Sequence, residues 1–465
     1  MTPTEADARS PTTRLPETAP SPTWRDAVAV YLQRRVLIVM LLGFSSGLPL
    51  ALSGSTLLVW MRESGVDLGT IGLFALVGTP YTLKFLWAPL VDALHVPFFT
   101  HQFGRRRGWL LFSQLLLIAA TLLLALADPA RSPAFVAFAA LLVATASSTQ
   151  DIVVDAFRVE SLPESEQAAG MAGYVAAYRI GMLASTAGAL FLVSGYESAG
   201  TLRSSAWMWG YVTMAAMILI GAVTALVATE PAQSARAEAA TGSETAFARV
   251  IHAAWGAFSE FLIRKDALAA LAFVVLFKFT DAFSGSMTAP FVIDLGFSRN
   301  DYAAIVKGVG LAATLIGGFA GGFVARRYSL AASLWIGGVL QAVANLSFSW
   351  LALVGVNQWA LAFAISAENF TSAIGTVIFV AYLSALCQNP LHTATQYALL
   401  TALAAVGRTY LSSGAGYVAK TTGWPLFFVI CVVVAVPSLI LLAYLQRRKH
   451  FAALETSPVI TRESG

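Results

Sequence analysis

The sequence has little charge for its length. Only 12% of its 465 residues are Asp, Glu, Lys or Arg, whereas about 25% is usual in soluble domains. Single hydrophobic cores stop growing near roughly 250 to 300 residues, so a soluble chain of this size would need several cores with polar surfaces between them. The residues that would build those surfaces are missing, and 57% of the chain is apolar. A soluble protein is excluded and a membrane protein is predicted.

Cysteine is also scarce. The two cysteines, Cys387 and Cys431, both lie inside apolar runs, which excludes a disulfide framework and a cysteine-rich metal site. We therefore expect no metal and no organic cofactor. The sequence pI of about 9.1 does not indicate nucleic-acid binding, because the basic residues lie mostly between apolar runs, where they orient a membrane protein.

Long apolar runs dominate the chain instead. A helix needs about 20 apolar residues to cross a bilayer, because unpaired backbone groups are too costly in hydrocarbon. The sequence predicts twelve such helices, at residues 36–61, 69–94, 108–127, 134–158, 167–194, 206–228, 267–294, 300–325, 329–354, 357–386, 393–419 and 425–446.

The loop charges predict the orientation. With the N-terminus inside, the outer loops carry few basic residues, namely Arg62, Arg131, Arg203, Arg299 and Lys420. Most other Lys and Arg residues outside the predicted helices then fall on the cytoplasmic side, as the positive-inside rule requires. We expect an all-α, multi-pass membrane protein with both termini in the cytoplasm.

The chain divides into two blocks of six helices. We expect a disordered cytoplasmic tail at 1–35, the two helical halves at 36–229 and 266–446, a cytoplasmic linker at 230–265 and a C-terminal tail at 447–465. Apolar residues at helical spacing in 244–261 favour an amphipathic helix on the membrane surface. A flexible linker is the alternative.

The two halves resemble each other in detail. Gln167 precedes Arg179 in the fifth run by the same interval that separates Gln396 from Arg408 in the eleventh run. Transporters built from such repeats bind their substrate between the repeats, near the middle of the membrane. We therefore expect a binding site between two pseudo-symmetric halves.

Ionisable residues lie deep inside several apolar runs, where each costs about 2.5 to 3.5 kcal/mol or more. They are Lys84, Asp151, Asp155, Arg179, Lys278, Asp281, Lys307, Glu368 and Arg408. Asp281, Glu368, Asp151 and Asp155 are candidate proton carriers, because burial raises the pKa of a carboxyl group and a nearby cation lowers it. The alternative is that these groups only pair with each other, as Lys278 and Asp281 could within one helix.

Arg179 and Arg408 occupy corresponding positions in the two halves. A guanidinium group stays charged and presents a fork of donors that suits carboxylates and phosphates. The sequence thus predicts a pair of anion ligands. A salt bridge across the cavity to Asp151 or Glu368 is the alternative.

Charged residues also border the second and third runs. Asp92 ends the second run, and Arg105, Arg106 and Arg107 open the third within GRRRG. This pattern resembles the cytoplasmic loop motif of the major facilitator superfamily, split here by an insertion. The resemblance implies a gate of charge pairs, with Asp155 or an acid in 160–166 as partner.

Further blocks make the resemblance more specific. Residues 43–52 (GFSSGLPLAL), 84–92 (KFLWAPLVD), 104–111 (GRRRGWLL), 149–156 (TQDIVVDA), 278–283 (KFTDAF), 394–400 (ATQYALL) and 407–408 (GR) are similar to stretches of AmpG-type muropeptide permeases. The resemblance implies a major facilitator fold that uses the proton gradient to import GlcNAc-1,6-anhydro-MurNAc and its peptides for cell-wall recycling and β-lactamase induction. The resemblance also implies a location in the bacterial inner membrane. We expect a monomer in the lipid bilayer.

A sugar with peptide carboxylates needs a polar cavity with cationic ligands. The substrate-binding candidates are Arg179, Arg408, Lys278, Gln150, Asn369, Gln396, Ser46 and Tyr178. The main alternative function is proton-driven export of drugs or metabolites. Two other classes are a membrane enzyme that acts on cell-wall intermediates and a sensor without transport.

Overall fold

The computed structural model describes residues 29–231, 266–387 and 393–455. Every regular element that it assigns in these ranges is helical. The linker predicted at 230–265, with its amphipathic helix, lies almost wholly outside the described residues, as do residues 1–28 and 456–465.

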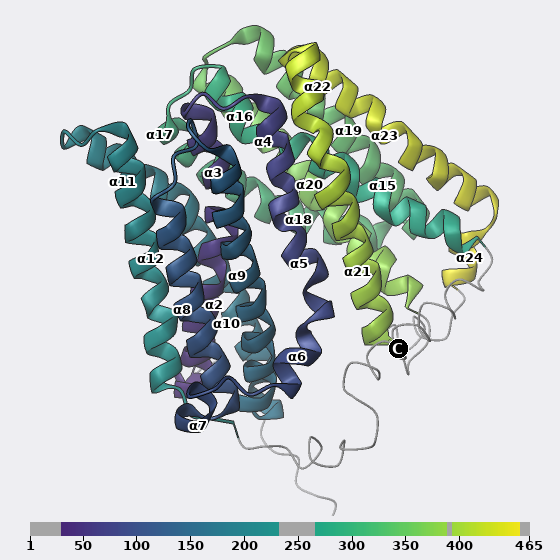
Figure 1. The fold of residues 1–465 in the computed structure, drawn as a ribbon. Helices are drawn as coiled ribbons and strands as arrows, with labels where there is room; N and C mark the ends of the chain where they lie inside the picture. The colour runs from purple at the N-terminus through teal and green to yellow at the C-terminus, as the bar shows by residue number, and fades with distance from the viewer. Residues whose placement is uncertain (1–28, 232–265, 388–392, 456–465) are drawn as a thin grey trace, which may run out of the picture.

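The N-terminal half contains the first six predicted spans (Figure 1). Its elements are η1 (Val30–Leu32), α2 (Arg34–Leu52), α3 (Ser55–Glu63), α4 (Leu68–Leu73), η2 (Phe74–Gly78), α5 (Thr79–Leu83), η3 (Lys84–Leu86), α6 (Ala88–Ala93), α7 (Phe99–Phe103), α8 (Arg105–Ala125), α9 (Pro133–Ser161), α10 (Glu164–Leu183), η4 (Ala184–Gly188), α11 (Ala189–Ser198) and α12 (Arg203–Val227).

The C-terminal half contains the other six. Its elements are α15 (Ala267–Gly285), α16 (Thr288–Asp294), α17 (Arg299–Asp301), η5 (Tyr302–Val309), α18 (Gly310–Arg327), α19 (Leu330–Val354), α20 (Gln358–Leu386), α21 (Thr393–Tyr410), η6 (Leu411–Gly414), α22 (Ala415–Thr422), α23 (Trp424–Arg447) and α24 (His450–Glu455).

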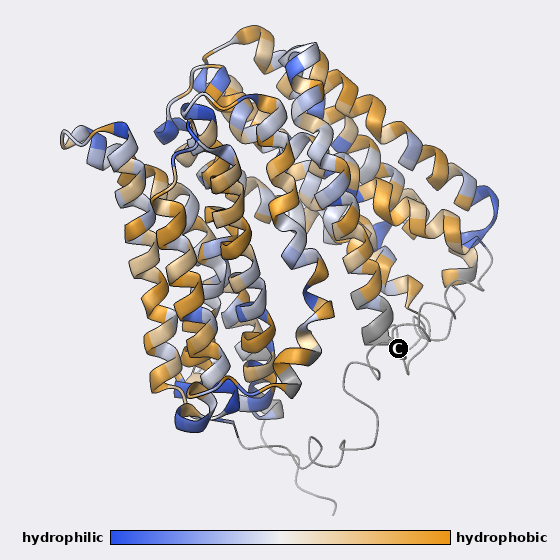
Figure 2. Cartoon of the chain, viewed as in Figure 1, coloured by the Kyte–Doolittle hydropathy of each residue, from blue (hydrophilic) through white to orange (hydrophobic). Residues whose placement is uncertain are grey.

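Ten helices in the described ranges are long and apolar enough to cross a membrane. They correspond to ten of the twelve predicted spans. The other two, predicted at 69–94 and 393–419, are chains of shorter helices interrupted by 3-10 segments at Phe74–Gly78, Lys84–Leu86 and Leu411–Gly414. Hydrophobic residues predominate along the long helices (Figure 2), and many of them are exposed, among them Phe319, which is 85% exposed. A lipid environment accounts for this exposure.

The two halves meet at one end, which we call the closed end; it lies at the top of Figure 1. There α3 contacts α16, α4 contacts α22, and α11 contacts α17. Gly72 and Gly416 allow the α4–α22 contact, because a Cβ on Gly416 would lie 1.9 Å from the carbonyl oxygen of Leu68. The corresponding π-helical segments η4 and η5 also pack together.

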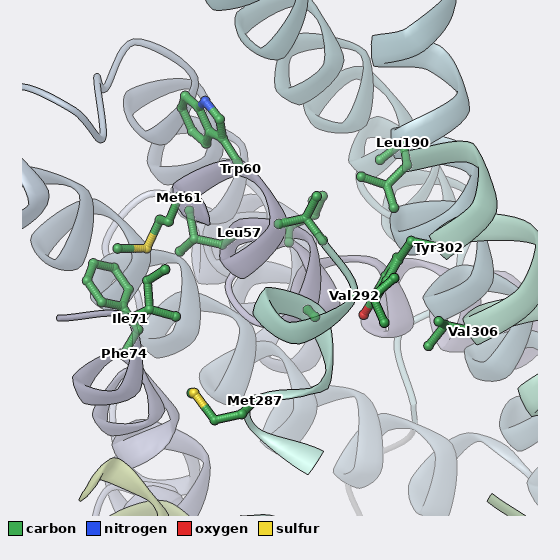
Figure 3. Close-up of a cluster of buried hydrophobic side chains, with 14 of the residues drawn as sticks. Leu57, Trp60, Met61, Ile71, Phe74, Leu190, Met287, Val292, Tyr302 and Val306 are labelled. Atoms are coloured by element: carbon green, nitrogen blue, oxygen red, sulfur yellow. The ribbon is translucent and has the colours of Figure 1, made fainter. Parts of the chain in front are cut away.

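Apolar packing follows the same division. One buried cluster at the closed end combines residues of both halves, among them Trp60, Ile71, Met287 and Tyr302 (Figure 3). The other two large clusters within the described ranges each belong to a single half. The halves are therefore joined by a shared core at the closed end and have separate cores toward the other end.

Candidate substrate cavity

Two adjoining cavities lie between the halves beneath the closed end. Their volumes are about 570 Å³ and 400 Å³, within the range of about 300 to 1,000 Å³ that is common for small-molecule sites. Both are lined by residues of each half, and Tyr81 and Glu368 line both. They form two compartments of one central site, where the sequence repeat predicts it.

The two symmetry-related arginines line different compartments. Arg179 lines the larger one and Arg408 the smaller one. Both side chains are exposed, and both charges act on the hydroxyl of Tyr178. Within the described ranges neither guanidinium has an ion-pair partner. The salt bridge to Asp151 or Glu368 that the sequence left open is not formed among the described residues, and the role of the two arginines as anion ligands stays a prediction.

The acids of the C-terminal half lie beside these arginines. Asp281 lines the smaller compartment; its Oδ2 lies 3.3 Å from Lys278 Nζ, and its Oδ1 accepts a 2.7 Å hydrogen bond from Ser372. Glu368 accepts a 2.9 Å hydrogen bond from the amide of Asn369. The Lys278–Asp281 pair, proposed as an alternative, is thus present, and Lys278 also donates to Thr376 at 2.9 Å.

The polar residues of the N-terminal half are packed between helices instead. Ser46 and Gln150 have no exposed surface. Ser46 donates a 2.7 Å hydrogen bond to Asp151, and the Gln150 amide lies 3.5 Å from the Ser46 hydroxyl. In this state a solute cannot reach Ser46 or Gln150 without a rearrangement of α2 against α9.

The predicted gate residues form contacts inside the N-terminal half. Arg105 and Arg106 both pair with Glu160, with the shorter distance 2.5 Å from Arg106. Arg107 donates to the carbonyl oxygens of residues 225 and 226 at the end of α12. Asp155 pairs with Arg158 at 3.6 Å rather than with the loop arginines. The side chains of Asp92, Gln167 and Gln396 lie outside the described residues.

Two cavity residues were not among the sequence candidates. The hydroxyl of Tyr81 is buried without a hydrogen-bond partner within the described ranges, although its residue lines both compartments. Lys307 lines the larger compartment, with Nζ 5.4 Å from the centroid of the Tyr302 ring. Lys307 was apparent as a charge within an apolar run, whereas a single tyrosine in a membrane helix carries no such signal.

The lining thus combines charges of both signs. Arg179, Arg408 and Lys307 supply positive charge, and one of the two acids, Asp281, is already paired with Lys278. A bundle of two six-helix halves around a central charged cavity is the architecture of a secondary transporter.

Comparison with known proteins agrees with this architecture. The family model of the Major Facilitator Superfamily matches residues 36–410. The nucleoside transporter NupG, in the crystal structure of a mutant form, has the same fold, with a TM-score of 0.66 at 14% identity over 90% of this chain and 99% of that one.

Closer relatives are found by sequence. The chain is 38% identical over 414 residues to the anhydromuropeptide permease of Escherichia coli K12, which covers 89% of this chain and 80% of the relative. It is 33% identical to the putative transporter AmpG 4 of Rickettsia felis, over 90% of this chain and 98% of that one. The chain belongs to the major facilitator superfamily and, within it, to the AmpG-type permeases. It is a multi-pass membrane transporter and not an enzyme.

Proposed function

We propose that this transporter imports anhydro-muropeptides, the sugar-peptide products of peptidoglycan turnover, from the periplasm into the cytoplasm. The similarity to the anhydromuropeptide permease supports this substrate. The observation that carries the proposal is the presence in the central cavity of Arg179 and Arg408, neither of which has an ion-pair partner among the described residues. A ligand with a sugar and several carboxylates fits a cavity with cations, hydroxyls and aromatic rings.

The loop charges support an assignment of the two ends of the protein to the two sides of the membrane. The closed end carries the residues that the positive-inside rule assigns to the outer face, among them Arg62, Arg299 and Lys420. The described state therefore faces the cytoplasm, with the periplasmic entrance shut. Import requires a second state in which the closed end opens and the halves rock around the central site.

Proton coupling is assigned to the C-terminal half. Asp281 and Glu368 line the cavity and are close enough for their charges to interact. Protonation of either acid would remove a negative charge from the cavity and change its interactions with Lys278 and Lys307. Under this proposal the two states expose these acids differently, so that binding of a proton shifts the balance between them.

The test is uptake of radiolabelled anhydro-muropeptide by right-side-out membrane vesicles. Vesicles with the transporter should accumulate the label above the external concentration, and a protonophore should abolish the accumulation. Vesicles without the transporter are the control. Efflux of the label against its gradient, or binding without flux, would replace this proposal with the exporter or the sensor.

A further inference from the structure

Two of the ion pairs that cross between the halves at the closed end form a reciprocal set. Arg299 at the start of α17 bonds Glu63 at the end of α3, with Nε 2.5 Å from Oε1. Arg62 at the end of α3 pairs with Asp294 at the end of α16. Each half thus contributes one acid and one arginine. Arg299 and Glu63 are nearly buried, with side-chain exposures of 6% and 11%.

Each acid is also held by an indole of its own half. Trp207, near the start of α12, donates a 3.1 Å hydrogen bond to the second carboxylate oxygen of Glu63. Trp424, at the start of α23, donates a 3.0 Å hydrogen bond to the second oxygen of Asp294. The two indoles occupy matching places, because α12 and α23 are the last spans of their halves.

The N-terminal version of this arrangement is the more elaborate. Arg299 also bonds Glu197 at 2.8 Å, and its guanidinium lies over the Trp207 ring, 5.5 Å from the centroid. The Trp207 ring in turn stacks on Trp60 at 5.6 Å, in the apolar cluster that both halves share. Trp207 therefore contacts the acid, the arginine and the apolar core of the closed end.

We infer that Trp207 and Trp424 are positioning residues of the periplasmic gate, which hold Glu63 and Asp294 ready for the arginine of the opposite half. The crossed pairs must break in every cycle, because substrate can enter only when the closed end opens. When the halves separate, each indole moves with its own acid. The carboxylate keeps one hydrogen bond and a fixed orientation, so less side-chain freedom is lost when the gate closes again.

The experiment measures opening of the gate and needs no substrate. Cys387 and Cys431 are replaced by alanine, and Ser55, which lines the larger compartment beneath the gate, becomes cysteine. A membrane-impermeant thiol reagent applied to right-side-out vesicles then reacts only when the gate is open. Inverted vesicles show that the cysteine is reactive from the other face.

Trp207→Phe should raise the rate of labelling from the periplasmic face by about three- to tenfold, the change expected when the freed Glu63 side chain must be ordered each time the gate closes. The matched control is Trp209→Phe on the same helix. Trp209 is 48% exposed and takes no part in the gate contacts described above, so its loss should leave labelling unchanged. Trp424→Phe should act like Trp207→Phe, with Trp359→Phe as its control.

A second measurement tests whether Trp207 acts by positioning Glu63 or only by packing in the apolar core. If Trp207 acts through Glu63, Trp207→Phe should add nothing once Glu63 is alanine, because the interaction is already gone. Equal labelling of the Trp207→Phe and Trp209→Phe proteins would overturn the inference, as would an undiminished effect in the Glu63→Ala background. The proposed function enters only through the assignment of the closed end to the periplasmic side, where the reagent is applied. If the protein does not take up muropeptides, the labelling result still stands.

Discussion

Replacement of Arg408 by lysine keeps the positive charge of the smaller compartment but removes the guanidinium fork. A bidentate pair with a substrate carboxylate would lose one of its two parallel hydrogen bonds. A hydrogen bond to a charged group contributes about 1.5 to 3 kcal/mol, and about 1.4 kcal/mol corresponds to a tenfold change in affinity. Because Arg408 is exposed in the cavity, solvent screening places the effect near the lower limit. We expect KM for muropeptide uptake to rise about tenfold.

The assay compares two substrates and two controls. Uptake of a muropeptide with free peptide carboxylates should weaken, whereas uptake of the same muropeptide with those carboxylates amidated should change little. Arg131→Lys is the matched control, because its side chain is 88% exposed in a loop. Arg408→Ala should still insert at the wild-type level, since removal of Arg408 leaves no buried acid unpaired within the described ranges.

The reasoning fails if Arg408→Lys takes up both substrates with an unchanged KM. It also fails if Arg408→Ala is lost from the membrane, because such a loss would indicate a structural ion pair. Membrane abundance measured beside uptake distinguishes these two results.

The remaining predictions concern the acids. Asp281→Asn should abolish accumulation against a gradient and spare insertion, because an amide cannot bind and release a proton as a carboxylate does. Accumulation at the wild-type rate would remove Asp281 from the coupling mechanism. Glu368→Gln should flatten the dependence of the uptake rate on pH, and an unaltered profile would leave Glu368 a structural residue. At the outer face, the hydrogen bond from Thr70 and then the contact with Lys420 lower the pKa of Asp67 below its usual 3.8. The ion pair of Asp67 with Lys420 therefore stabilises the closed gate fully above pH 3.8, the usual pKa of an aspartate. This stabilisation is lost as the pH falls through the lowered pKa of Asp67. Thiol labelling of the gate, divided by the labelling of inverted vesicles at the same pH because the thiolate fraction falls on acidification, should begin to rise at a higher pH in Thr70→Val than in the parent, and identical curves would contradict this.

Much of the membrane architecture was apparent in the chain alone. Ten of the twelve runs coincide with helices long enough to span a membrane, because a backbone in hydrocarbon must satisfy its own hydrogen bonds and this requirement acts on each segment separately. Four cavity residues, Arg179, Asp281, Glu368 and Arg408, could also be identified from the sequence. A charged side chain is costly in lipid, so charges within apolar runs imply a cavity, and all four residues line it. The motif blocks were sufficient to indicate the AmpG-type permeases, and the comparisons confirm this assignment.

Only the tertiary structure decided which polar groups face the cavity and which hold helices together. The side chains of Ser46 and Gln150 have the hydrogen-bonding groups that a substrate site needs, but packing of α2 against α9 buries them. The sequence identified Arg62 and Arg299 only as charges of the outer loops. Their partners Asp294 and Glu63 lie 232 and 236 residues away, and no local pattern specifies such pairs. They depend on how the two finished halves meet, which is a property of packing between helices and not of any single segment.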